Sequence, residues 1–97
     1  MIVRVFRVRT HPGREAEFRQ FLIETGRPGL LQREGCIGAI IGQRTWGDRP
    51  ESLFISRWAS REALEAFAGE HWEEGHINAK AAHLIAEVFC DNYEEIE

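Results

Sequence analysis

The stretch "SRWASREALEAFAGEHW", residues 56–72, decides the order of the elements around it, because it passes from a strand into a helix. The β-branched and aromatic residues of "SLFISRW", residues 52–58, predict the strand. Ser60 offers a side chain that caps the start of a helix. On that helix, one face is predicted to carry Ala63, Leu64, Phe67, Ala68, His71 and Trp72. We therefore expect an apolar helical stripe that ends on a histidine and a tryptophan.

The segments on either side alternate between strand and helix patterns. "MIVRVFRVRT" predicts a first strand that "HPG" ends. The helix that follows is expected to stop or kink at "GRPG", because proline and glycine interrupt helices. The other expected elements are a helix at 14–25, a glycine-softened strand at 35–46, a helix at 77–87 and a last strand at 88–96.

The resulting order, β-α-β-β-α-β, predicts a ferredoxin-like α+β fold for a single domain over residues 1–97. In that fold the antiparallel sheet has the strand order 4-1-3-2, and the helices cover one face. The acidic last strand then lies beside the basic first strand, so Arg7 and Arg9 are expected to face Asp91 or Glu87. The two cysteines, Cys36 and Cys90, would lie on opposite edge strands as reduced thiols.

The predicted sheet is apolar on both faces. The third strand places Leu53 and Ile55 on one face, and Phe54 and Trp58 on the other. Because the helices cover one face only, the other needs a different cover. A second copy of the same sheet is the simplest cover, so we expect a homodimer built through the sheet face.

Composition and spacing argue against several classes of partner. The net charge of −4 argues against nucleic-acid and anionic-membrane partners. The apolar runs are too short to span a bilayer, and arginines interrupt the N-terminal stretch, which is unlike a signal peptide. We therefore expect a cytoplasmic protein. Because Cys/His clusters at ligand spacing and a glycine-rich phosphate loop are both lacking, we expect neither a metal nor another cofactor.

Three pieces of the chain carry a resemblance to a known family: "RTHPGREAEF" after the first strand, "REGCIGA" before the second, and "SRWASREALEAFAGEHW". With them the chain resembles the dimeric α+β barrel superfamily and, within it, the antibiotic biosynthesis monooxygenase family. The resemblance implies a small pocket between the helices and the sheet. It also implies a cofactor-independent monooxygenase, because some members oxidise quinols or polycyclic aromatic substrates with O₂ without flavin, metal or haem.

Such a reaction needs a proton acceptor and a shaped, partly charged pocket. His71 is the candidate catalytic residue, because an imidazole that titrates near neutral pH can accept a phenolic proton. The candidate substrate-binding residues are Trp72, Trp58, Arg57, Phe67 and His76. The alternative for His71 is a half-buried histidine packed near a helix end. For His76, Lys80 and His83 the spacing also allows a metal site, although a solvent-exposed helix face explains it better.

Two other functions stay open at the level of sequence. A related branch of the family binds and degrades haem, with an asparagine on the first strand and a tryptophan and an axial histidine farther along. This chain has no asparagine in residues 1–10, Phe67 takes the place of the tryptophan, and His76 falls roughly at the axial histidine. The third possibility is a non-catalytic domain of the same fold that binds a small molecule.

Overall fold

The computed structural model describes residues 1–74 and 78–96. Its strands are β1 (Ile2–Thr10), β2 (Cys36–Arg44), β3 (Glu51–Trp58) and β4 (Ile85–Glu94). Its helical segments are α1 (Glu15–Phe21), the π-helical turn η1 (Leu22–Gly26), α2 (Arg27–Leu31), α3 (Arg61–Ala68) and the 3-10 turn η2 (Ala82–Leu84).

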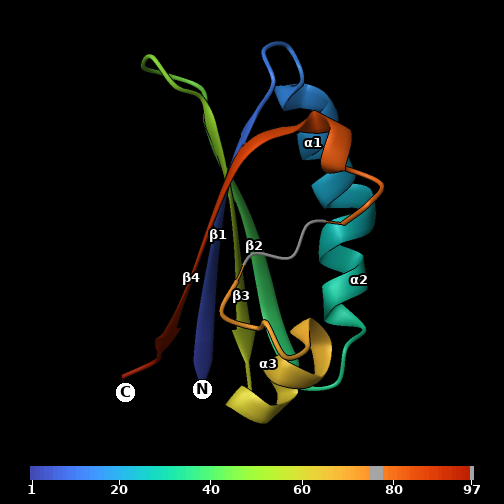
Figure 1. Ribbon diagram of the computed structural model, residues 1–97, viewed down its shortest axis with the longest axis vertical. Helices are drawn as coiled ribbons and strands as arrows, with labels where there is room; N and C mark the ends of the chain where they lie inside the picture. The colour runs from blue at the N-terminus through green and yellow to red at the C-terminus, as the bar shows by residue number, and fades with distance from the viewer. Residues whose placement is uncertain (75–77, 97) are drawn as a thin grey trace.

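The four strands form one antiparallel sheet in the order β2-β3-β1-β4, with all three α-helices on the same face (Figure 1). This is the predicted 4-1-3-2 order, so the ferredoxin-like α+β fold is confirmed. The predicted places of Cys36 and Cys90, on the edge strands β2 and β4, are confirmed as well, and both are free thiols. The chain ends lie side by side, and the Glu95 amide donates to the Met1 carbonyl at 2.9 Å.

The first helical segment is longer than predicted, because "GRPG" does not end it. Pro28 sits in the first turn of α2, where its fixed φ suits a helix even though it has no N–H to donate. The preceding turn is π-helical, and such wide turns absorb a local disruption within a continuing helix. The helical path therefore runs from α1 through η1 to Leu31.

The helix predicted at 77–87 was wrong. Within its described part, Asn78 Oδ1 accepts from the Lys80 amide at 2.9 Å in a turn, and only η2 is helical. Ile85 already pairs with Thr10 of β1, so β4 begins three residues earlier than expected. Pairing with β1 therefore outweighs the helix propensity of this alanine-rich stretch. His83 lies near Glu17, with Nε2 and Oε2 3.8 Å apart.

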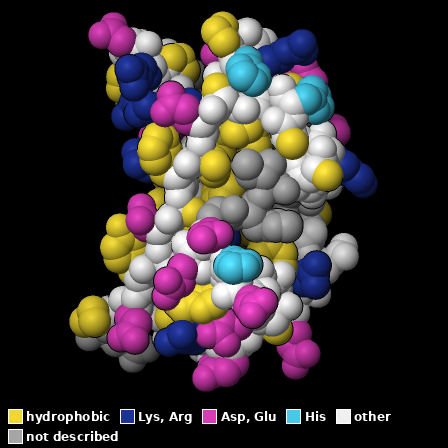
Figure 2. All heavy atoms as spheres, viewed as in Figure 1, with side chains coloured by type: hydrophobic (Ala, Val, Ile, Leu, Met, Phe, Trp, Pro, Cys, Tyr) yellow, Lys and Arg dark blue, Asp and Glu magenta, His cyan; other side chains and the backbone are white. Residues whose placement is uncertain are grey.

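The core consists of two clusters at opposite ends of the sheet–helix interface. The first contains Val8, Phe18, Leu22, Ala81 and Leu84, and the second contains Ile2, Trp58 and Leu64. Figure 2 shows hydrophobic side chains along the seam between the sheet and the helices. Between the two clusters, side chains do not fill all of the space between the sheet and the helices.

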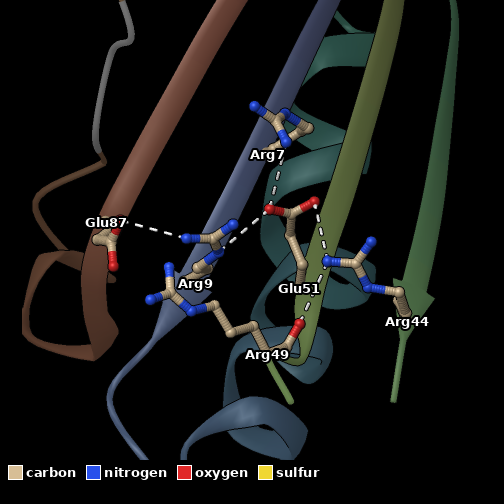
Figure 3. A network of polar contacts seen from close by, with 6 residues as sticks. All are labelled: Arg7, Arg9, Arg44, Arg49, Glu51 and Glu87. Carbon is tan, nitrogen blue, oxygen red and sulfur yellow. Dashed lines mark hydrogen bonds and ion pairs between the residues drawn. The ribbon is translucent and has the colours of Figure 1, made fainter. Parts of the chain in front are cut away.

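The other sheet face carries apolar side chains in its middle and charges at its ends. Ile40 and Ile55 are register partners on β2 and β3, and Ile40 is 59% exposed. At one end Arg7, Arg9 and Arg44 converge on Glu51, with N–O distances of 3.5, 3.4 and 3.9 Å (Figure 3).

The predicted pairing between charged residues of β1 and β4 is found for Arg9 but not for Arg7. Arg9 Nη1 lies 3.4 Å from Glu87 Oε2, as expected from the pairing of β1 with β4. Arg7 turns instead toward β3, where it pairs with Glu51. Glu51 is the better partner because its side chain is only 10% exposed, which strengthens its attraction for a cation.

Candidate functional site

A cavity of about 290 Å³ lies between the sheet and the helices, in the gap between the two core clusters. Its walls come from β1, β3, the helical path from α1 to α2 with Arg33 after it, α3, the segment before β4 and the first residue of β4. The aromatic wall residues are Phe6, Phe18, Phe21, Phe54 and Phe67. The polar ones are Arg4, Thr25, Arg33, Ser56 and Asn78. This mixture of aromatic walls and a few polar groups is typical of small-molecule sites.

Glycines on the helical path help to keep the cavity open. A Cβ atom on Gly26 would lie 3.2 Å from Leu22 Cδ2 and 3.6 Å from the Phe54 ring. A side chain there would press the π-helical turn away from the sheet or fill the gap. Gly29, one turn farther on, also lines the cavity. The sequence "GRPG" therefore leaves space where a larger side chain would fill it.

Arg4 is the buried charge of the site. It is 4% exposed and lies on the helix-facing side of β1. Its Nη1 donates to the Trp72 carbonyl at 2.7 Å and to Asn92 Oδ1 at 3.4 Å, and its Nη2 donates to the Glu74 carbonyl at 3.0 Å. Burial lowers the pKa of the guanidinium, but arginine stays protonated in proteins. Arg4 thus brings a buried positive charge to a mainly aromatic wall.

Ser56 lies beside Arg4 and is held by a buried tryptophan. The Trp58 indole is fully buried and stacks on Phe67, with ring centroids 5.1 Å apart. Its Nε1 donates to Ser56 Oγ at 3.0 Å. Because Oγ accepts this bond, the Ser56 hydroxyl hydrogen can point to another acceptor, such as a ligand in the cavity.

The candidate residues from the sequence fall at different distances from this cavity. Phe67 forms part of its wall. Trp58 stands behind Phe67 and Ser56 and supports both. Trp72 contributes its backbone carbonyl to Arg4, while the Arg61 guanidinium carbon lies 4.6 Å from the centroid of its ring.

The other three candidates lie outside the described lining. The apolar stripe was expected to reach His71, but α3 ends at Ala68 because Gly69 takes a φ of +82°. His71 is exposed in the turn that follows. Arg57 points to the opposite sheet face and forms a bidentate pair with Glu95 at 2.8 Å, which lowers the pKa of that carboxyl. His76 lies outside the described residues.

Arg4, Ser56 and Arg33 were missed at the level of sequence. Arg4 had a usable signal, since the alternation of a strand places it on the same side of β1 as Ile2, Phe6 and Val8. A charged side chain on the buried face of a strand needs hydrogen-bond partners, a counter-charge or a bound ligand. Arg33 gave no signal, because only the fold brings its guanidinium carbon within 5.2 Å of the Phe67 ring centroid.

Residues 1–74 and 78–96 contain neither a metal-binding cluster nor a helix that could cross a membrane. No group of three or more His, Cys, Asp or Glu side chains there is placed to hold a metal ion. No helix in those residues is long and apolar enough to cross a membrane.

The sequence model of the antibiotic biosynthesis monooxygenase family matches residues 1–78, which contain α1, α2 and α3 and three of the four strands. The chain belongs to the antibiotic biosynthesis monooxygenase family. The cavity of this family member is lined by residues from the matched region together with Ala81 and Ile85. A comparison with curated proteins finds no sequence relative.

Solved structures share the fold of this antibiotic biosynthesis monooxygenase family member at low sequence identity. A candidate antibiotic biosynthesis monooxygenase from Deinococcus radiodurans has a TM-score of 0.77 at 16% identity, covering 100% of this chain and 94% of the other. One from Nitrosomonas europaea has a TM-score of 0.76 at 15% identity, covering 100% of both chains. The haem-degrader MhuD of Mycobacterium tuberculosis, with two haems in its active site, has a TM-score of 0.74 at 15% identity, covering 100% and 97%.

Proposed function

We propose that this protein is a cofactor-independent monooxygenase that oxidises a small phenol or quinol-type aromatic substrate with O₂ in the cavity beside Arg4. The observation that carries the proposal is the lining of this cavity, where five phenylalanines surround a buried arginine. Family membership supports the reaction class. The volume of about 290 Å³ is at the lower end for small-molecule sites, which favours a substrate of one to a few rings.

The reaction is balanced without an added reductant. A phenol loses its proton, and the phenolate passes one electron to O₂. The resulting radical pair combines at a ring carbon, and the O–O bond then breaks. With a phenol, one oxygen atom becomes the second carbonyl of a quinone, and with a quinol it becomes a hydroxyl group on the quinone ring. The other oxygen atom leaves as water with the two hydrogens that the substrate gives up. Catalysis then requires a stabilised phenolate, a fixed ring and a place for the proton.

The described lining supplies the first two requirements. The phenylalanines can sandwich a flat ring, and Arg4 and Ser56 can meet its oxygen. The described lining does not supply the third requirement, a proton acceptor, because its only ionisable side chains are Arg4 and Arg33. The role of His71 as general base stays a prediction. From its exposed turn, His71 would have to reach the substrate at the cavity mouth or through water.

We also propose that the protein acts as a homodimer through the open face of the sheet. Ile40, 59% exposed, and Tyr93, 57% exposed, are large apolar or aromatic side chains left in water on the strands of a single chain. Ile55 and Val5 lie between these two edge strands on the same face, and an apolar sheet face of this kind marks an association surface. A second copy can cover it, because a two-fold interface pairs the same surface with itself. The cytoplasmic location also stays a prediction.

Haem binding is the second candidate function, favoured by the structural likeness to MhuD and by two arginines that could pair with haem propionates. The described cavity wall contains no histidine, cysteine, methionine or tyrosine to ligate iron. His76 belongs to the residues that the structure does not describe. Titration with haemin tests this candidate: a one-to-one complex with a sharp Soret band that His76→Ala abolishes would favour haem over a phenol.

Oxygen uptake tests the proposed reaction. Protein freed of metals by chelation is mixed with a panel of quinols, naphthols and anthrones, and O₂ consumption is followed beside quinone formation. The proposal expects protein-dependent uptake with at least one substrate, with one O₂ consumed for each quinone formed and no hydrogen peroxide released. Uptake that is no faster than the spontaneous rate across the panel would contradict it.

A further inference from the structure

Arg4 has no anionic partner in the described part of the chain. Every ion pair there is formed by other residues. All three hydrogen-bond acceptors of Arg4 are neutral oxygens: the carbonyls of Trp72 and Glu74 and the side-chain amide of Asn92. A buried charge without a counter-charge is costly, and it is retained where something else balances it.

Cys90, a titratable side chain that acts on Arg4, does not balance the charge. Cys90 lies next to Arg4 on the adjoining strand β4. Burial raises the pKa of the Cys90 thiol, and the pull of Arg4 in the other direction only partly offsets this. Cys90 is therefore a neutral thiol at neutral pH, and the charge on Arg4 remains uncompensated.

The cavity wall around Arg4 adds no negative charge either. Its described lining contains Arg4 and Arg33 but no aspartate or glutamate. The five N–H groups of a guanidinium exceed the three hydrogen bonds that Arg4 makes to described residues. Ser56, its register partner on β3, can donate one more hydrogen bond from the same patch of wall.

We propose that Arg4, with Ser56, is the specificity-determining anion site of the cavity, and that it selects the phenolate form of a small phenol over the neutral form. The ligand is thus an aromatic ring with one anionic oxygen. The phenylalanine walls take the ring, while the guanidinium and the hydroxyl take the oxygen. The choice of a phenol rests on the proposed function, but the charge preference is a property of binding and needs no turnover.

A coloured phenol tests this preference directly. Para-nitrophenol is yellow only as its phenolate, and para-nitroanisole is its neutral methyl ether of similar shape. In buffer where the free phenol is half ionised, the wild-type chain should deepen the yellow colour and bind the phenolate at least about tenfold more tightly than the ether. Equal affinity for the two, no colour change, or failure to bind the phenolate would overturn the proposal.

Three variants identify the residue responsible. Arg4→Gln should lose the preference for the phenolate, whereas Arg4→Lys should keep part of it because the charge remains. Arg14→Gln removes the same charge from an exposed surface position and should behave as wild type. If Arg4→Gln does not fold, the assignment is decided by the phenolate preference of Arg4→Lys and by the wild-type affinities for the phenolate and the ether. An unchanged preference in folded Arg4→Gln would contradict the assignment.

The outcome separates this inference from the proposed reaction. Phenolate selection without oxygen uptake would uphold the anion site and overturn the monooxygenase. Oxygen uptake without phenolate selection would uphold the monooxygenase and overturn the role of Arg4. A benzoate ion added as competitor distinguishes a general carboxylate site, because it should displace the phenolate only if the site accepts any small aromatic anion.

Discussion

Arg4 and Ser56 face each other across β1 and β3 as register partners, and both line the cavity. The two strands are the central pair of the sheet, so the backbone of both residues is fixed there, while the Arg4 guanidinium is held by the carbonyls of Trp72 and Glu74 and by Asn92 of β4. Sites built on such elements hold their geometry better than sites on loops. The polar spot in the aromatic wall is therefore preorganised before a ligand arrives.

The homodimer prediction is tested at Ile55, which lies on the open sheet face opposite Ile40. Ile55→Lys places a charge in the middle of the proposed interface, where it would lose its water on association. We expect wild type to sediment as a dimer at micromolar concentration and the variant as a folded monomer. Ile23→Lys, the same change on the helical side, is the control and should stay dimeric. A monomeric wild type would contradict the prediction.

His71→Ala tests the predicted general base. Loss of a general base lowers the rate by about 10²–10⁴-fold, so activity on an accepted quinol should fall by that factor in a dimer that stays folded. The measurement is the rate per folded dimer at several pH values. His83→Ala, another exposed histidine, serves as the matched control. If the two variants keep equal, wild-type rates, His71 has no part in proton transfer.

Trp58→Phe tests the support behind the site. The variant loses the Nε1 bond to Ser56 and part of a fully buried ring, so the free energy of unfolding should fall by about 1–3 kcal/mol. Because Ser56 loses its orientation, KM for the substrate should rise while kcat changes less. Trp46→Phe, at a 71% exposed tryptophan, should alter neither quantity. Denaturant titration and steady-state kinetics give both values, and an unchanged KM would leave Trp58 with a packing role only.

Most of the fold could be predicted because strand patterns and strand order depend on local composition. The first strand, the hairpin of β2 and β3 and the cap of α3 were all visible in the sequence, and Ser60 Oγ accepts from the Ala63 amide at 3.1 Å as a cap should. The errors arose where tertiary contacts decide. A turn, the 3-10 turn η2 and the pairing of Ile85 with Thr10 take the place of a predicted helix, and a π-helical turn carried the first helical path past Pro28.

The candidate site was predicted less well than the fold. The sequence placed Phe67 among the binding residues, and the structure has it in the cavity wall. The prediction for His71 assumed that the apolar stripe of the helix continues to this residue. In the structure α3 ends at Ala68, about one turn before His71. Arg4 could have been found from strand alternation, whereas its lack of a counter-charge becomes visible only when β4 and residues 72–74 are placed around it.

Labelling with isotopically heavy dioxygen tests the central claim most directly. Metal-free protein turns over an accepted quinol or phenol under the labelled gas, and mass spectrometry of the quinone product counts the heavy oxygen atoms. The account predicts one heavy atom in each product molecule and the other in water, with formation of the labelled product strongly reduced in Arg4→Gln. A quinone without heavy oxygen would show simple oxidation of the substrate, and labelled product made equally well by Arg4→Gln would place the reaction elsewhere than the cavity beside Arg4.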